Sequence, residues 1–148
     1  MFWLLFVWSF NVRSAEKSDL TQPSEVVAWP SKGLLLYVVA HLDVTTFRNS
    51  IGPRREPGKS SLHEYGFNVI HANELNADLI NTSINWRMHF EMIKTTDSYL
   101  LICFDDQAIN GGTYHTRNLI KVTPSGHANL LLGIIDKQLN IECPYLGE

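Results

Sequence analysis

Residues 84–92, Ile-Asn-Trp-Arg-Met-His-Phe-Glu-Met, alternate without a break between apolar and polar side chains. Successive side chains of an extended chain point to opposite faces, so this period of two predicts a β-strand with one buried and one solvated face. The buried face would carry Ile84, Trp86, Met88, Phe90 and Met92. We therefore assign Trp86 a structural role in the core of a sheet.

The segments around this strand also favour β structure. Residues 65–70 form a shorter strand candidate, and residues 98–104, Ser-Tyr-Leu-Leu-Ile-Cys-Phe, have the apolar and aromatic content of a buried strand. The tripeptide Asn110-Gly111-Gly112 favours a hairpin turn, because Asn and Gly accept the positive φ of tight turns. Residues 113–122 would then form the returning strand.

The carboxyl-terminal part has a different pattern. Residues 127–141 place Leu131, Ile134, Ile135 and Leu139 at helical spacing after the breaker Pro124. The expected fold is thus mainly β (α+β), an antiparallel meander of about four or five strands with one carboxyl-terminal helix, preceded by an apolar amino-terminal region.

Length and charge limit the classes of function. The chain has 148 residues, of which 45% are hydrophobic, and its 12 Lys and Arg against 15 Asp and Glu give a net charge of −3. This composition suits an ordinary globular protein and argues against nucleic-acid binding, which needs a basic face. We divide the chain into an apolar segment 1–15, a second apolar run with a basic loop at 16–60, and a β domain at 61–148.

The amino terminus permits two placements in the cell. Residues 1–10, Met-Phe-Trp-Leu-Leu-Phe-Val-Trp-Ser-Phe, are apolar but too few to span a bilayer, which takes about 20 helical residues. They fit in part the apolar region of a signal peptide cleaved after Ala15, although no Lys or Arg precedes them. The alternative is a membrane anchor.

A second apolar run supports the membrane alternative. Residues 33–44, Gly-Leu-Leu-Leu-Tyr-Val-Val-Ala-His-Leu-Asp-Val, precede a basic loop that contains Arg48, Arg54, Arg55 and Lys59. Two apolar runs followed by basic residues are typical of a membrane hairpin whose carboxyl side is cytoplasmic. The basic loop would then bind an anionic membrane surface. On its length alone, the second run also fits a buried strand.

The redox state of the two cysteines, Cys103 and Cys143, depends on whether the chain is secreted or faces the cytoplasm. Outside the cytoplasm they would form one disulfide that closes a loop of about 40 residues, and in the cytoplasm both would stay reduced. The pair therefore predicts a disulfide only for a secreted chain.

The alternation in residues 84–92 places one group of polar side chains on the same face of the strand. Arg87, His89 and Glu91 share the solvated face of residues 84–92, where they fit either cross-strand ion pairs or a binding site. Asp105 and Asp106 would face opposite ways at the end of a strand, as turn residues. The histidines lack metal-ligand spacing, and residues 52–60 lack the glycine spacing of a phosphate-binding loop. We expect no catalysis, cofactor or metal.

Residues 62–109 resemble the carboxyl-terminal domain of the YcxB-like family of small bacterial membrane proteins. The resemblance is carried by an acidic residue and a glycine before a strand, an apolar-x-Trp position, a Thr-Asp turn and an aromatic-Leu-Leu strand. Here these are Glu64, Gly66, Ile84, Trp86, Phe90, Thr96, Asp97, Tyr99, Leu100 and Leu101. The chain departs from the family at 110–116, Asn-Gly-Gly-Thr-Tyr-His-Thr, where the family has a Pro-Lys-aromatic segment. The resemblance implies a small β domain on the cytoplasmic side of a membrane, with no enzymatic activity.

Two functions remain open at this point. The first is a non-enzymatic, membrane-associated β domain that binds a protein partner or a lipid surface, with the basic loop or the row at Arg87 as contact. The second is a secreted or periplasmic, disulfide-bridged β domain that binds a small apolar ligand or a protein.

Overall fold

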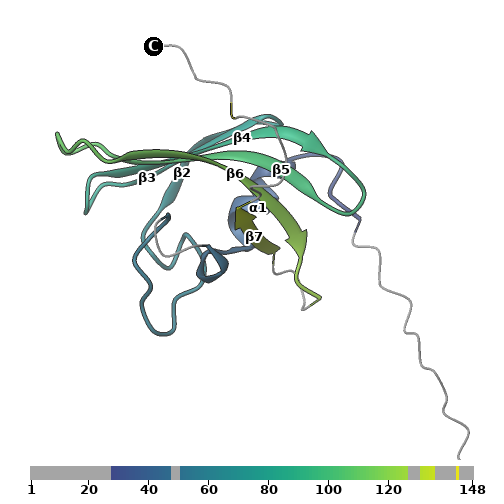
Figure 1. Ribbon diagram of the computed structural model, residues 1–148, viewed down its shortest axis with the longest axis horizontal. Coiled ribbons are helices and arrows are strands. Elements are labelled where there is room, and N and C mark those ends of the chain that lie inside the picture. Colours follow the sequence, from purple (N-terminus) through teal and green to yellow (C-terminus); the bar gives the residue numbers. More distant parts are fainter. Residues whose placement is uncertain (1–27, 48–50, 127–130, 136–142, 144–148) are drawn as a thin grey trace, which may run out of the picture.

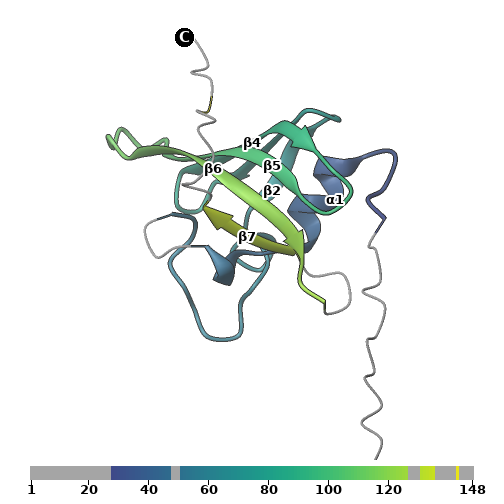
Figure 2. The ribbon, with the colours of Figure 1, turned by 45° about the vertical axis from the view of Figure 1, so that its right-hand side comes forward.

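The computed structural model describes residues 28–47, 51–126, 131–135 and 143. These residues form a seven-stranded sheet in the order β1-β7-β6-β5-β4-β3-β2. The sheet arches over α1 and over the segment that joins β1 to β2 (Figures 1 and 2). The elements are α1 Leu34–His41, β1 Leu42–Asp43, the 3-10 helix η1 Val44–Thr46, β2 Asn68–Ala72, β3 Asn76–Asn81, β4 Trp86–Thr95, β5 Leu100–Ala108, β6 His115–Pro124 and β7 Leu131–Ile135.

The prediction of a mainly β protein is confirmed, and β4 lies next to the central strand β5 of the sheet. β4 pairs antiparallel with β3 and with β5, so that Phe90 lies between Ala77 and Phe104. Met88 and Phe90 are both 0% exposed, whereas Arg87 between β3 and β5 is exposed. The alternation of apolar and polar residues thus separates the concave, buried face of the sheet from its convex face.

The predicted meander of four or five antiparallel strands is wrong in two respects. The sheet contains seven strands, and β1 pairs parallel with β7, with Leu42 opposite Leu131. A parallel pair requires a long connection between its strands, and here β2 to β6 lie between them in the chain. A strand of two residues is too short to show a sequence pattern that would predict such a pairing.

The predicted carboxyl-terminal helix is also wrong, because residues 131–135 form β7. Leu131 and Gly133 are buried while Ile134 is exposed, which is the alternation of a strand. Gly133 faces the ring of Phe47, and a Cβ on this glycine would lie 2.6 Å from Phe47 Cε1. The rest of the predicted helix, with Leu139, lies outside the described residues.

The second apolar run folds mostly as a helix rather than as the buried strand that its length suggested. Its residues Leu34–His41 form α1, and Leu42–Asp43 form β1. The Glu74 carboxylate accepts hydrogen bonds from the backbone N–H of Gly33 (2.9 Å) and of Leu34 (3.4 Å) at the start of α1. In the part of the chain that the structure describes, no helix has the length and apolar character needed to cross a membrane. Residues 1–15 lie outside that part.

The larger of two clusters of buried hydrophobic side chains joins the segment before residue 60 to the sheet. The ring of Phe104 on β5 packs against Phe90 (centroids 4.8 Å apart) and Phe47 (5.2 Å). Leu35 and Val38 of α1 belong to the same cluster of buried side chains. The concave face therefore packs against α1, η1 and residues 62–67, whereas Trp86 at the start of β4 is only partly buried.

Candidate functional site

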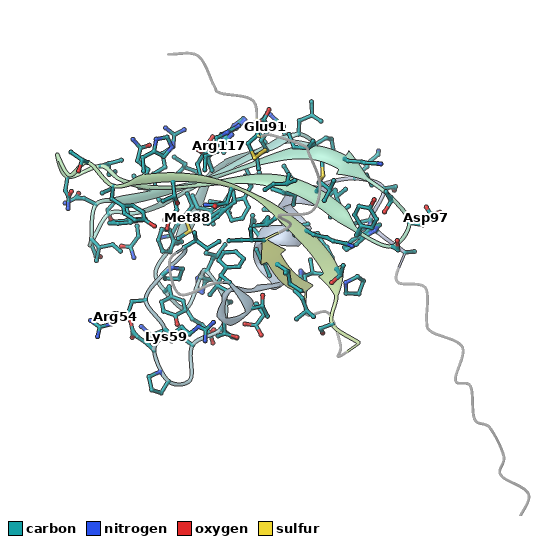
Figure 3. All side chains as sticks on the ribbon, in the orientation of Figure 1. Arg54, Lys59, Met88, Glu91, Asp97 and Arg117 are labelled. Atoms are coloured by element: carbon teal, nitrogen blue, oxygen red, sulfur yellow. A yellow bond between two sulfur atoms is a disulfide. The ribbon has the colours of Figure 1, made fainter. Side chains whose placement is uncertain are left out.

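A cavity of about 780 Å³ lies between the segment after η1 and the start of β4. Its walls are largely aromatic and aliphatic, and include Phe47, Ile51, Phe67, Ile84, Trp86 and Tyr114. Figure 3 shows Arg54 on the loop that faces the concave side of the sheet, the side toward which Met88 points. The loop and the sheet thus form opposite walls of one apolar cavity.

Trp86 marks the boundary between the core and this cavity. Along the concave face of β4, Met88 and Phe90 are 0% exposed, Trp86 is partly buried, and Ile84 before the strand is 52% exposed. The Trp86 ring packs against the hydrophobic core and against the Tyr114 ring, whose centroid lies 5.1 Å away. Trp86 therefore has the structural contacts that its alternation implies, and it also forms part of the cavity wall.

Behind this wall lies the carboxylate of Asp106, which is 0% exposed. It accepts hydrogen bonds from the Trp86 indole N–H, from the Gly52 backbone N–H (2.8 Å) and from the Tyr114 hydroxyl (3.3 Å). Burial raises the pKa of Asp106, and the hydrogen bonds from Trp86, Gly52 and Tyr114 oppose that rise. One carboxylate thus connects the loop, β4 and the β5–β6 turn around the cavity.

Asp105 and Asp106 do not end their strand as predicted, because β5 continues to Ala108 and both residues are buried. They do face opposite ways. Asp106 points to the concave side with Trp86, and Asp105 points to the convex side, where it binds Arg117 and His115. Each carboxylate has partners distant in the chain, which local turn chemistry cannot reveal.

The basic loop of the sequence separates into residues with different surroundings. Arg54 and Arg55 are exposed and line the cavity. Arg55 Nη2 donates a hydrogen bond of 2.8 Å to the Phe47 carbonyl oxygen. Lys59 forms an ion pair with Glu56 (2.7 Å) and lies over the Tyr65 ring. Arg48 lies outside the described residues.

The row Arg87, His89 and Glu91 lies on the convex face, away from the cavity, and takes part in cross-strand ion pairs. Asp78 on β3 binds Arg87 Nη2 (2.6 Å) and His89 Nδ1 (3.0 Å). Burial alone would raise the pKa of Asp78, but the hydrogen bonds from Arg87 and His89 outweigh it and lower that pKa. The Arg87 guanidinium and the His89 ring thus bind a carboxylate within the sheet.

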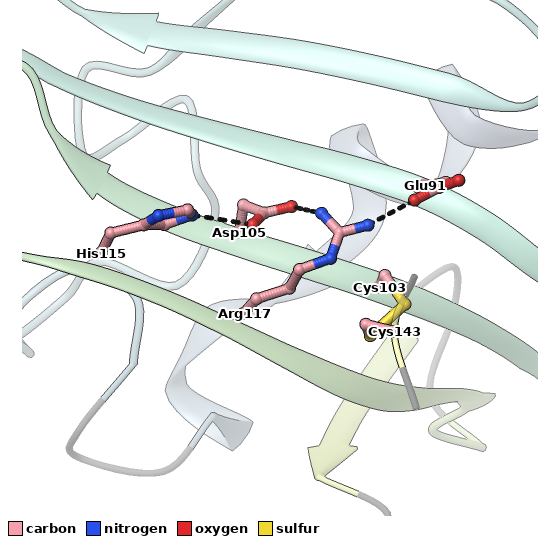
Figure 4. The surroundings of a disulfide bond; sticks show 6 residues. All are labelled: Glu91, Cys103, Asp105, His115, Arg117 and Cys143. Carbon is pink, nitrogen blue, oxygen red and sulfur yellow. Dashed lines mark hydrogen bonds and ion pairs between the residues drawn. A yellow bond between two sulfur atoms is a disulfide. The ribbon is translucent and has the colours of Figure 1, made fainter. Parts of the chain in front are cut away.

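Glu91 extends this network toward β6. Its carboxylate binds Arg117 Nη2 (2.5 Å), and Arg117 also binds Asp105, which accepts a further contact from His115 Nε2 at 3.0 Å (Figure 4). The Cys103–Cys143 disulfide lies on the same face, with a Cα–Cα distance of 5.6 Å (Figure 4). This is the bridge that the sequence offered for a secreted chain.

Most of the cavity could not be predicted from the sequence. No local pattern singles out Phe47, Ile51, Phe67 or Tyr114, because these side chains meet only through tertiary contacts. A signal did exist for Asp106, which follows Ile102 and Phe104 at spacing two and so places a carboxylate on the dry face of β5. A buried polar residue of this kind is informative, since carboxylates are rarely buried without partners.

Among the described residues, no three His, Cys, Asp or Glu side chains gather in a way that could hold a metal ion. No protein-family model, no curated protein and no solved structure matches this chain. The concave-side cavity is the feature whose geometry supports a functional argument.

Proposed function

We propose that this chain is a non-enzymatic binding domain that takes a small apolar ligand into the concave-side cavity. The observation that carries the proposal is the cavity itself, whose volume of about 780 Å³ falls within the range of about 300–1,000 Å³ common for ligand sites. Its walls are aromatic and aliphatic, and Tyr114 and Ile84 remain 37% and 52% exposed there. A ligand would cover apolar surface that otherwise contacts water.

The hydrogen bonds around Asp106 support a cavity that exists before a ligand arrives. Gly52 belongs to the loop wall, and Trp86 and Tyr114 belong to the sheet wall. Because the same carboxylate binds all three, the two walls are held at a fixed separation. A preformed cavity binds more tightly, since little ordering remains to be done on binding.

The cavity lining supports binding rather than catalysis. Among the described residues, its ionisable side chains are those of Arg54, Arg55 and Tyr114. Burial, together with the nearby Asp106, raises the pKa of the Tyr114 phenol, so the phenol stays neutral. Arginine and a neutral phenol are poor general bases, and the described residues of the cavity lining include no cysteine, serine, histidine or carboxylate.

The disulfide supports the secreted or periplasmic alternative for the location of the domain. Disulfides persist in oxidising compartments and are rare in the cytosol. Cys103 and Cys143 are bonded to each other, and the described residues contain no free cysteine.

A fluorescence titration with N-phenyl-1-naphthylamine, a neutral probe that brightens in apolar surroundings, tests this function. We expect saturable binding that weakens in Ile84→Ser, which removes an apolar side chain from the cavity mouth. Ile70→Ser is the matched control, because Ile70 is 60% exposed on β2 and does not line the cavity. Equal effects of the two substitutions, or the absence of saturable binding, would contradict the proposal.

The exposed arginines favour a second candidate, weak association with an anionic membrane surface. Within the described residues, neither Arg54 nor Arg55 has a carboxylate partner. Basic residues near an anionic surface contribute about 1 kcal/mol each, and salt screens this attraction. Sedimentation with phosphatidylserine vesicles should show binding that the Arg54→Glu, Arg55→Glu double variant abolishes. Binding that persists in the double variant would exclude this contact.

A further inference from the structure

We infer that the ligand of this cavity is an amphipathic carboxylate, whose apolar chain lies against Trp86 and Phe47 and whose charged end meets Arg54 and Arg55. This inference rests on the proposed function and adds the chemical class of the ligand. It follows from the order of polarity along the cavity, which is apolar where Phe47, Phe67 and Trp86 line it and cationic at the exposed loop.

The two guanidinium groups have capacity left for an anion. Arg54 makes none of the hydrogen bonds or ion pairs found among the described residues. Arg55 uses Nη2 for the Phe47 carbonyl and retains its other N–H donors. Glu56, the acidic neighbour of both in the chain, is held by Lys59 at 2.7 Å. Within the part of the chain that the structure describes, these two positive charges thus have no acidic partner at the mouth of the cavity.

A carboxylate suits this pair of side chains better than a neutral polar group does. The guanidinium fork matches the geometry of a carboxylate and can bind it through two parallel hydrogen bonds. The protein as a whole carries a net charge of −3, so the positive charge at this loop is local and not a general property of the surface. A neutral ligand of the same shape would make no ion pair with these arginines.

The acidic group behind the cavity does not oppose such a ligand directly. Asp106 is 0% exposed, and its carboxylate is already bound by Trp86, Gly52 and Tyr114. The raised pKa of Asp106, caused by its burial, further favours the neutral form of its carboxyl group. The hydrogen bond from Gly52 also anchors the loop that carries the arginines, so their backbone is held at the mouth.

Isothermal titration calorimetry of the full chain with decanoate and with decanol tests the inference. The two probes share an apolar chain length and differ in charge. We expect decanoate to bind about tenfold more tightly than decanol, the size of one charge-assisted contact. Arg54→Gln should remove most of this preference, because it should weaken decanoate binding much more than decanol binding. Lys94→Gln, an exposed lysine on β4 that does not line the cavity, should leave both affinities unchanged.

The outcomes separate this inference from the function on which it rests. Equal affinities for decanol and decanoate would overturn the inference and leave an apolar binding site in place. Failure of both probes to bind would overturn both. Binding to anionic vesicles without binding of monomeric decanoate would also overturn the inference, because it would assign the arginines to a membrane surface. An unchanged melting temperature of Arg54→Gln would show that its effect on decanoate does not come from misfolding.

Discussion

The backbone N–H of Gly52 donates a hydrogen bond of 2.8 Å to Oδ2 of Asp106, although 54 residues separate the two in the chain. This contact joins an irregular loop to the inner face of β5. Gly52 has a φ of 75°, and a Cβ at this position would lie 2.7 Å from Phe47 Cδ2. Only glycine therefore lets the loop approach the carboxylate and the ring of Phe47 together.

Replacing Asp106 by alanine should destabilise the protein strongly. The substitution leaves the partly buried Trp86 indole N–H and Gly52 N–H without their acceptor. The expected loss is about 2–3 kcal/mol in the free energy of unfolding, measured by urea titration. Asp97→Ala, on an exposed turn residue (Figure 3), should change it by less than about 0.5 kcal/mol. Equal costs for the two variants would show that Asp106 does not hold the walls.

The pH dependence of stability should report the raised pKa of Asp106. Burial raises this pKa above the ordinary value of 3.8, so in the interval above 3.8 the folded protein binds more protons than the unfolded chain. Its contribution to stability is complete below that value and is lost as the pH rises through the folded-state pKa. As the pH rises through the folded-state pKa, the parent should lose stability relative to Asp106→Asn, in which residue 106 does not titrate. A difference independent of pH would contradict the raised pKa.

The sequence allowed a correct prediction where a pattern was compatible with one secondary structure only. It did not where the same pattern was compatible with both a helix and a strand. The strict alternation around Met88 fits only a strand. The apolar residues of Leu131–Ile135 fit a helix at spacing three and four and a strand at spacing two, and the contact of Gly133 with Phe47 decides between them. The cavity was unreadable for a related reason, since Arg54 and Trp86 meet at it across the fold.

Trp86→Ala and Arg87→Ala should differ sharply in their effect on stability. The Trp86 ring packs on the core, and its removal should cost about 3 kcal/mol, at the low end for a large aromatic residue because part of its surface faces the cavity. Arg87 makes an exposed ion pair with Asp78, and its loss should cost less than about 1 kcal/mol. Urea titration of both variants measures the difference. A reversed order would require the opposite faces of β4 to be buried.

The disulfide should be protected from alkylation and should stabilise the fold. Intact-mass analysis after alkylation without reductant should show no label on Cys103 or Cys143 in protein from its native host. The double change to serine should lower the free energy of unfolding by about 4 kcal/mol, the loop-closure value for a separation of 40 residues. Label on both cysteines would instead favour a reducing compartment and the membrane-associated alternative.

Glu64 should titrate far below an ordinary glutamate. Hydrogen bonds from the backbone N–H groups of Ser61 and Ser60, each 2.8 Å long, lower its pKa from 4.5 to about 2. The stabilisation from Glu64 should therefore be present above pH 4.5 and be lost as the pH falls toward 2. Glu64→Gln should remove that dependence, and NMR titration of the carboxyl carbon reads the pKa directly. A titration midpoint near 4.5 would contradict the hydrogen bonds from Ser60 and Ser61.

The bridge between Cys103 and Cys143 also has a mechanical consequence. It closes a loop of chain that contains β6 and β7, with a sequence separation of 40. A force that pulls on the chain before Cys103 and after Cys143 is transmitted from β5 through the disulfide and does not stretch β6 and β7. About 130 Å of extended chain is then withheld from stretching. Force spectroscopy in the presence of a reductant would release this length as an additional extension.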